Sequence, residues 1–501
     1  MKINNSVATG LIALALAACT DLSENLYDRV QSADYGKTPA EIETIVGRAY
    51  AALRGFNDGV TISYPANEYV LFLKETTSDE ACIPTRGTDW YDGGRYQEAQ
   101  THTWTPENPM LLSAWRYYYE TIGRINAVIY QVDQSELTPD EKDVVNAELR
   151  GLRAYLYYEL LDMFGNVPIV TSFEELELPT NSTRAQVYEF VETELLEIMD
   201  LLPSGILYGR FTQNVANTLL ARLYLNSEVY IGEARWQECI NACDKVNGYV
   251  LENNFFTSFL TDNQVSREII FAIPYDHTEG TTGNYFASLT FHYNQRNAFS
   301  ATGNYTDCVN GICCQPGVYG MYEENDIRRN GYLIGDQIDR ATGNVIIMPA
   351  TGNPLTYTDE IADYFHALQN EGVRIKKYEV QEGEVWERDH DFVVMRYSEI
   401  LLMKAECYIR MGSPALARPL VAQVRERAGV DTPAEVDLEF LDDELLREFA
   451  FEGHRRTDNI RMGDFFKPWW NKGATEAFRG IFPIPARALE LNSKLAQNPN
   501  Y

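Results

Sequence analysis

The sequence has little positive charge for its size. Its 501 residues include 42 Lys and Arg against 73 Asp and Glu, which gives a formal net charge of -31. Such a chain repels the phosphate backbone of nucleic acids and the anionic surface of a bilayer. We therefore predict that the protein does not bind nucleic acid.

Long hydrophobic runs are also missing. The apolar run at 11–18 is too short to cross a bilayer, which takes about 20 residues, and no later stretch is a second candidate. Lys2 precedes the run and LAAC at 16–19 ends it, so the layout is that of a signal peptide whose end resembles a bacterial lipobox. We predict a lipoprotein signal peptide at 1–18 and a lipidated Cys19. An ordinary signal peptide cleaved at the same place is the alternative.

The motifs of metal centres and of common enzymes are absent. The cysteines form no CxxC pair and the 6 His show no metal-ligand spacing, so we predict no metal and no cofactor. No nucleophile elbow, HExxH or phosphate loop occurs either. The protein is therefore predicted not to be an enzyme, and a glycoside hydrolase with paired carboxylates is the catalytic alternative.

Of the 8 Cys, seven follow Cys19, and an odd number leaves at least one thiol free. Cys308 and Cys313 could bridge a loop. Three others lie at apolar positions of expected helices, where buried thiols are predicted: Cys239, Cys243 and Cys407.

Helical periodicity is what the sequence does contain. Apolar residues recur at steps of three and four over 115–129, 149–163 and 187–202, which places them on one face of a helix. Two later helices are each followed by a glycine, Gly232 or Gly412, and then by a second helix. This order is that of tetratricopeptide repeats, although the period is irregular. We predict a mainly α fold of degenerate tetratricopeptide-like helix pairs.

The texture changes between about 250 and 390, where Gly, Asn, Thr, Asp and Tyr are dense and only short β-like runs occur, such as 269–273 and 345–348. A structureless loop of that length inside a compact domain is uncommon, so we predict a loop-rich lobe with short β-strands, packed on the helices. The predicted organisation is a signal peptide at 1–18, a helical part at 19–250, the lobe at 251–390, and a helical part at 391–501 that completes the scaffold.

Several stretches together resemble the SusD/RagB family of Bacteroidetes outer-membrane lipoproteins. They include the leader ending in Cys19 and four longer segments: LRGLRAYLYYELLDMFGNVPIV at 149–170, REIIFAIP at 267–274, RYSEILLMKAECYIRMG at 396–412 and LLREFAFEGHRRTDNIRMGDFF at 445–466. Each segment alone has a plain explanation as an amphipathic helix or a turn. Their shared order over most of the chain carries the resemblance.

The resemblance implies a SusD-like fold, in which tetratricopeptide-like helix pairs support a loop lobe that carries the ligand surface. It also implies a cell-surface lipoprotein of the outer membrane that binds a glycan and passes it to a SusC-like TonB-dependent transporter. A helix-repeat scaffold or family member that binds peptide instead of glycan is the alternative.

The segment GTDWYDGGRY at 87–96 is the first candidate for a glycan site. Sugar rings present apolar C–H faces and hydroxyls, so a site for them needs aromatic platforms beside carboxylates, amides and arginines. A tight turn at Gly93-Gly94, with Trp90 plugging the lobe, explains the segment equally well. The candidate residues are Trp90, Tyr91, Asp92, Arg95 and Tyr96.

The second candidate segment is NYFASLTFHYNQRN at 284–297, where rings are interleaved with amides and Arg296. A β-strand that buries Tyr285, Phe291 and Tyr293 on one face is the alternative, because these rings occupy odd positions. The candidate residues are Tyr285, Phe286, His292, Tyr293 and Asn294.

A charge cluster near the C-terminus has a structural interpretation. Charge runs on helices are usually solvated faces, so we predict salt bridges that hold the scaffold rather than a functional site. The cluster comprises Glu448, Glu452, Arg455, Arg456, Asp458 and Arg461.

Overall fold

The computed structural model describes residues 38–57, 62–63, 69–174, 177–276, 278, 284, 286–302, 308–384 and 388–501. The predicted signal peptide, Cys19 and Tyr285 lie outside the described residues. Within them, helices predominate and strands are short and few, which confirms the mainly α prediction. Among the described helices, none combines the length and the apolarity that a membrane span requires.

The elements have the following bounds. The described helices are α2 (Pro39–Ala52), α3 (Val70–Thr76), α4 (Arg95–Thr101), α5 (Pro109–Asp133), α6 (Pro139–Met163), α7 (Arg184–Ile198), α8 (Gln213–Leu225), α9 (Ser227–Ile231), α10 (Trp236–Cys243), α11 (Phe286–Thr290), α12 (Arg296–Phe299), α13 (Tyr397–Arg410), α14 (Pro414–Ala428), α15 (Leu438–Phe449), α16 (Arg455–Met462) and α17 (Ala486–Leu491). The described strands are β1 (Phe56–Asn57), β2 (Ile62–Ser63), β3 (Ala81–Cys82), β4 (Ile269–Ile273), β5 (Cys313–Cys314), β6 (Tyr332–Leu333), β7 (Gly335–Asp336), β8 (Thr356–Tyr357), β9 (Arg374–Ile375) and β10 (Phe392–Arg396).

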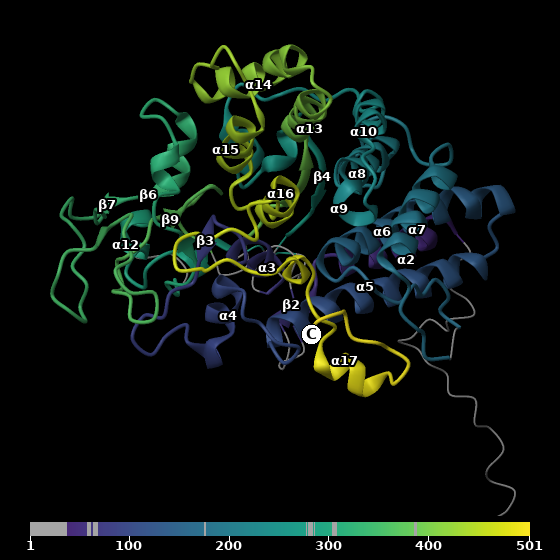
Figure 1. The fold of residues 1–501 in the computed structure, drawn as a ribbon, viewed down its shortest axis with the longest axis horizontal. Coiled ribbons are helices and arrows are strands. Elements are labelled where there is room, and N and C mark those ends of the chain that lie inside the picture. Colours follow the sequence, from purple (N-terminus) through teal and green to yellow (C-terminus); the bar gives the residue numbers. More distant parts are fainter. Residues whose placement is uncertain are drawn as a thin grey trace, which may run out of the picture.

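Packed helix pairs form the scaffold (Figure 1). Helix α5 packs on α6 and α6 on α7, while α8 packs on α10 and α13 on α14. Gly232 and Gly412 have φ angles of 74° and 75°, a left-handed conformation that glycine adopts without steric cost and that ends one helix before the next begins. The predicted order of helix, glycine and helix is therefore present at both places.

The lobe contributes short two-stranded sheets, at the left of Figure 1. Strand β6 pairs with β9, β7 with β8, and β3 with β5. The longest pair, β4 with β10, is antiparallel and buried along its whole length. The β-like run at 269–273 is thus a strand, whereas the run at 345–348 forms only isolated bridges, to Ile338 and Pro354.

All seven described cysteines are buried and free. The interpretation that Cys308 and Cys313 bridge a loop is therefore wrong. Cys313 instead lies opposite Cys82 in the β3–β5 pair, with 3.8 Å between the two sulfur atoms. Cys239, Cys243 and Cys407 are buried thiols, as predicted.

Buried ion pairs hold the C-terminal helices in place. Arg455 pairs with Asp79 and Asp442, each at 2.6 Å, and Arg456 pairs with Asp162 at 3.0 Å. The prediction that this charge cluster forms scaffold salt bridges is confirmed, but the arginines are buried rather than solvated. Each guanidinium has several donors in a fixed fork, so one arginine can satisfy carboxylates from two different elements.

A buried pair of carboxyl groups, Glu75 on α3 and Glu80 before β3, has no exposed surface. Glu75 accepts a hydrogen bond from the Gly453 N–H and Glu80 one from the Phe451 N–H, each at 2.6 Å. Burial raises the pKa of Glu75 to about 7, and burial together with the Glu75 charge raises the pKa of Glu80 well above its usual value. Lys377 and Lys74 oppose this rise in the pKa of Glu75, and Lys377 also opposes it for Glu80. The pair is therefore stable when it holds a proton.

We expect Glu75→Gln to be more stable relative to the unsubstituted protein at pH 8 than at pH 5. A carboxyl with a raised pKa contributes stability below its unfolded pKa, about 4.3, and that stability is lost as the pH rises through about 7. The amide of Gln cannot ionise, so the difference in the free energy of unfolding should grow by on the order of 2 kcal/mol between the two pH values. Urea unfolding at both pH values measures it. If the difference in the free energy of unfolding between the two proteins is the same at both pH values, Glu75 does not hold a proton in the folded protein at pH 5.

Candidate functional site

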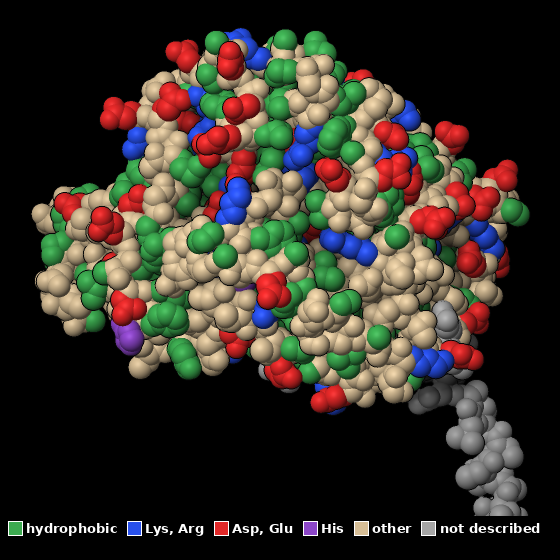
Figure 2. Space-filling model, viewed as in Figure 1, with side chains coloured by type: hydrophobic (Ala, Val, Ile, Leu, Met, Phe, Trp, Pro, Cys, Tyr) green, Lys and Arg blue, Asp and Glu red, His purple; other side chains and the backbone are tan. Residues whose placement is uncertain are grey.

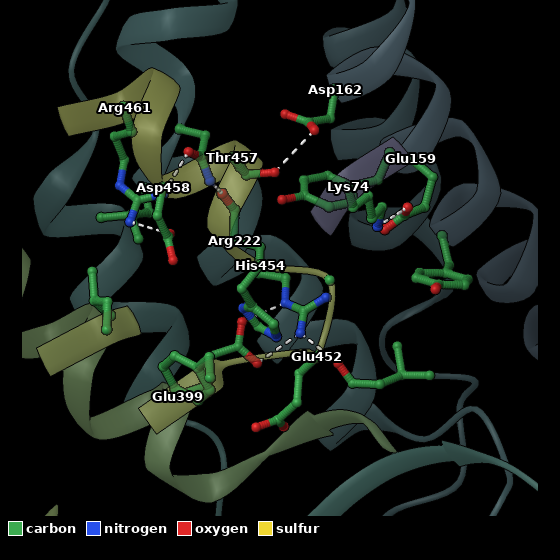
Figure 3. Close-up of a pocket in the computed structure, with 18 of the residues that line it drawn as sticks. Lys74, Glu159, Asp162, Arg222, Glu399, Glu452, His454, Thr457, Asp458 and Arg461 are labelled. Atoms are coloured by element: carbon green, nitrogen blue, oxygen red, sulfur yellow. Dashed lines mark hydrogen bonds and ion pairs between the residues drawn. The ribbon is translucent and has the colours of Figure 1, made fainter. Parts of the chain in front are cut away.

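An internal cavity lies between the scaffold helices and α16 (Figure 3). Its charged side chains face one another in pairs, for example Lys74 with Glu159 and Arg461 with Asp458. The cavity volume is about 70 Å³. That is room for about two water molecules and far below the roughly 300–1,000 Å³ of ligand pockets. This cavity is therefore too small for a sugar, and a glycan site is expected on the surface of the lobe.

A tight turn at 86–89, here called the Gly87 turn, begins the first candidate segment. Arg86 and Asp89 exchange backbone hydrogen bonds of 3.0 and 3.1 Å across it. Gly87 has a φ of 69°, and Trp90 and Asp92 follow with φ of 63° and 43°. Positive φ is strained for residues other than glycine, costs roughly 1–3 kcal/mol each, and is concentrated at functional sites.

Trp90 is held on one side and partly exposed on the other. Its indole N–H donates to the Val309 carbonyl at 2.7 Å, and its ring lies so close to Gly311 that a Cβ there would fall 2.4 Å from it. Its ring centroid is 5.6 Å from that of Tyr96. Both interpretations of this residue therefore have support: Trp90 plugs the lobe and also leaves part of its ring at the surface.

The other candidate side chains of the first segment differ in exposure. Tyr91 is 57% exposed and is the most open ring of the segment. Asp92 is exposed, and Arg95 donates to the Asp92 carbonyl at 2.9 Å and to the Tyr69 hydroxyl at 2.6 Å. Tyr96 is only 2% exposed and packs in the core, so its ring is not a surface for a ligand.

The second candidate segment is not a strand. It forms α11, a turn and α12, because the backbone of Phe291 bonds to Ala287 and that of Gln295 to His292. The β-strand alternative is therefore wrong. Phe286 and His292 are buried and not available to a ligand, and burial lowers the pKa of His292 to about 4, so its ring is neutral.

The two segments meet at one hydrogen bond. The Tyr293 hydroxyl donates to the Asp89 carboxylate, although the residues are 204 positions apart. Burial and the Asp89 charge raise the pKa of Tyr293, so the hydroxyl keeps its proton. Asn294 is partly exposed beside it. We call Trp90, Tyr91 and Tyr293 the ring platform.

A third segment, residues 364–370, lies against the Gly87 turn and was not among the candidates from the sequence. The Thr85 N–H donates to the Tyr364 carbonyl at 3.0 Å, and the Ala367 N–H donates to the Thr85 carbonyl at 2.9 Å. Between this segment and the turn runs an open groove, here called the amide groove. It is lined by Arg86, Gly87, Met348, Thr351, Asn353, His366, Ala367, Leu368, Gln369 and Asn370.

Two buried arginines fix the loops around the groove. Arg86 donates to the carbonyls of Gly311 and Glu371, at 3.3 and 2.8 Å. Arg374 donates to the Gln369 carbonyl at 2.9 Å and to the Asn310 side chain at 2.8 Å. The groove and the platform therefore rest on the same rigid support, which is what a preformed binding surface requires.

Comparison with known proteins gives the class. A model described as the SusD family matches residues 267–501, and a model described as starch-binding, associating with outer membrane, matches residues 55–225. The helix-pair scaffold with its loop lobe is thus that of a SusD-like protein. Known structures have the same fold: a laminarin binding SusD-like protein superposes with a TM-score of 0.75 at 22% identity, covering 93% of this chain and 100% of its own.

Sequence relatives agree with the family models. The starch-binding protein SusD of Bacteroides thetaiotaomicron is 27% identical over 468 residues, 82% of each chain. SusD-like protein P2 of Formosa agariphila is 25% identical and covers 98% of each chain. The chain belongs to the SusD/RagB family, as the sequence resemblance implied. Starch-binding protein SusD and a surface glycan-binding protein A of the same fold are named as binding proteins and not as enzymes, in agreement with the prediction for this chain.

Proposed function

We propose that the protein is a cell-surface glycan-binding lipoprotein that captures an oligosaccharide or polysaccharide on the ring platform and in the amide groove. The observation that carries this proposal is the hydrogen bond between Tyr293 and Asp89, which joins two ring-bearing segments beside a groove of amides. Rings of this kind stack on the apolar faces of sugars, and carboxylate and amide groups bind their hydroxyls.

The names of similar proteins support the same class of ligand. Among the solved structures of this fold is a surface glycan-binding protein A from Bacteroides thetaiotaomicron in complex with laminarihexaose, with a TM-score of 0.74 and 23% identity. The family model that matches the N-terminal half also carries starch binding in its description.

The proposed location is the outer membrane, next to a transporter. Lipidation of Cys19 anchors it to the outer membrane, where it passes the glycan to a SusC-like TonB-dependent transporter. Each stacked ring contributes only about 1 kcal/mol beyond the area it buries, so we expect micromolar to millimolar affinity. Weak binding suits transfer, and a shared membrane raises the effective concentration of the two proteins.

Tyr91→Ala is expected to weaken glycan binding about fivefold, the equivalent of about 1 kcal/mol for one exposed ring. Retardation in native gels that contain single polysaccharides measures binding, and a reducing-sugar assay on the same mixtures should stay at background. Phe173→Ala is the matched control, because both rings are 57% exposed and Phe173 lies against Tyr130 in the helical part. Release of reducing ends, or retardation by peptides alone, would contradict the proposal.

A further inference from the structure

We propose that the site selects an uncharged glycan and rejects anionic ones, such as polyuronates and sulfated polysaccharides. This inference rests on the proposed function and narrows the class of ligand. It follows from the charges that line the amide groove and its rim.

Most of the groove lining offers dipoles, and its ionisable side chains are the buried Arg86 and the exposed His366, whose ring bonds to Asp363. Thr351, Asn353 and Leu368 are exposed along it, and Leu368 has 64% of its surface open. Gln369 contacts the neutral ring of His292 at 3.2 Å and carries no charge itself. Amides and hydroxyls match the donors and acceptors of sugar hydroxyls, and the leucine side chain matches their apolar C–H faces.

The arginines near the groove form hydrogen bonds within the protein. Arg86 and Arg374 are almost completely buried. Their Nη groups bond to backbone carbonyls, to the Cys313 thiol and to Asn310, and each Nε is buried without a partner among the described residues. Arg95 bonds to Tyr69 and to the backbone of Asp92. An anionic glycan needs a guanidinium or ammonium group directed at its carboxylate or sulfate, because bidentate arginine contacts supply the specificity for these groups. No arginine that lines the described part of the groove is oriented in that way.

The charges at the rim are negative. Asp89 in the Gly87 turn and Asp363 beside His366 are exposed, and Asp92 is exposed next to Tyr91 of the ring platform. A hydrogen bond from His366 lowers the pKa of Asp363, which keeps it ionised. Figure 2 shows a similar pattern on a larger scale: Lys and Arg are seen over the helices at the top and right, whereas the lobe at the lower left shows acidic, apolar and uncharged polar groups together with a histidine. A polyanion that approaches this surface is repelled at low ionic strength.

Two exposed arginines elsewhere on the lobe are the cations that could bind an anionic glycan. Arg340 donates to the Phe299 carbonyl at 2.8 Å and pairs with Glu382 at 3.5 Å. Arg296 begins α12, shortly after Tyr293. If an anionic glycan were the ligand, Arg296 would be the cation closest in sequence to the platform, so its replacement is part of the test.

The test uses two sets of polysaccharides at 20 mM NaCl. The neutral set is laminarin, starch, mannan and galactan, all of which consist of hexoses with a C6 carbon, and the anionic set is alginate, polygalacturonate, chondroitin sulfate and heparin. The neutral polysaccharide that binds is then oxidised at C6 to its uronate form. We expect binding in the neutral set alone and at least tenfold weaker binding of the oxidised form. That difference should shrink in 0.5 M NaCl and in Asp92→Asn/Asp363→Asn.

Three results would overturn the inference. Binding of any anionic polysaccharide with equal or higher affinity would do so, as would an oxidised form that binds as well as its parent. The third is a loss of polyanion binding in Arg296→Gln. Binding in neither set would contradict the proposed function itself, and binding in the anionic set alone would leave that function intact while refuting the selectivity.

Discussion

Gly311→Ala is expected to weaken glycan binding about fivefold to tenfold, the same loss that we expect when the ring itself is removed in Trp90→Ala. The added Cβ would fall between 2.4 and 2.7 Å from three atoms of the Trp90 ring, which is closer than van der Waals contact allows. The indole must move away, and its hydrogen bond to the Val309 carbonyl is then lost. The Trp90 ring would still be present but displaced. A loss of binding would therefore show that the position of the ring matters, and not only its presence.

Gly320→Ala is the matched control for this prediction. It lies in the same lobe, and a Cβ there meets no atom within 4 Å. Isothermal titration with the polysaccharide found in native gels measures the affinities, and circular dichroism checks that both variants are folded. If Gly311→Ala binds as the unsubstituted protein does, Trp90 serves only as a plug of the lobe.

Arg396→Leu is expected to lower the free energy of unfolding by about 3–5 kcal/mol, because it leaves buried carboxylates without their partner. Arg396 lies in β10 and pairs with Glu268 at 2.9 Å and Glu452 at 2.7 Å. It also pairs with Glu448. Burial alone would raise the pKa of Glu448, but Arg427 and Arg396 lower it well below its usual value, so the carboxylate stays charged.

Urea unfolding at pH 7 measures this loss against two further variants. Arg487→Ala removes an ion pair with Glu490 in which both side chains are exposed, and should cost less than about 1 kcal/mol. Arg396→Lys keeps the charge but not the fork of donors and should recover part of the stability. An Arg396→Leu protein as stable as Arg487→Ala would show that the other cations of the network compensate.

The scaffold could be predicted because its signal is local. Apolar residues spaced by three and four over 149–163 define one helix face, and α6 covers those residues. The C-terminal charges were also assigned correctly as salt bridges. Their burial could not be foreseen, because one of the two carboxylate partners of Arg455, Asp79, lies 376 positions away in the sequence.

The site was predictable only in part. Rings next to carboxylates pointed to Trp90 and Tyr91, but composition does not tell an exposed ring from a buried one, and Tyr96 is in the core. Alternation over nine residues offered a strand as the alternative where α11 forms. The amide groove had no local signal, because Asn353 and Gln369 are ordinary loop residues until the fold brings them to the Gly87 turn.

The way Arg86 and Arg374 hold the loops has a consequence for how this surface can evolve. Between them they bond to the main-chain carbonyls of Gly311, Gln369, Glu371 and Gly372. Carbonyl groups are the same in every residue, so the anchors do not depend on which side chains the loops carry. If the groove binds glycan as we propose, substitutions at 353 or 368–370 change which sugar is recognised while the loops keep their shape. A lineage would then acquire a new nutrient without rebuilding the scaffold.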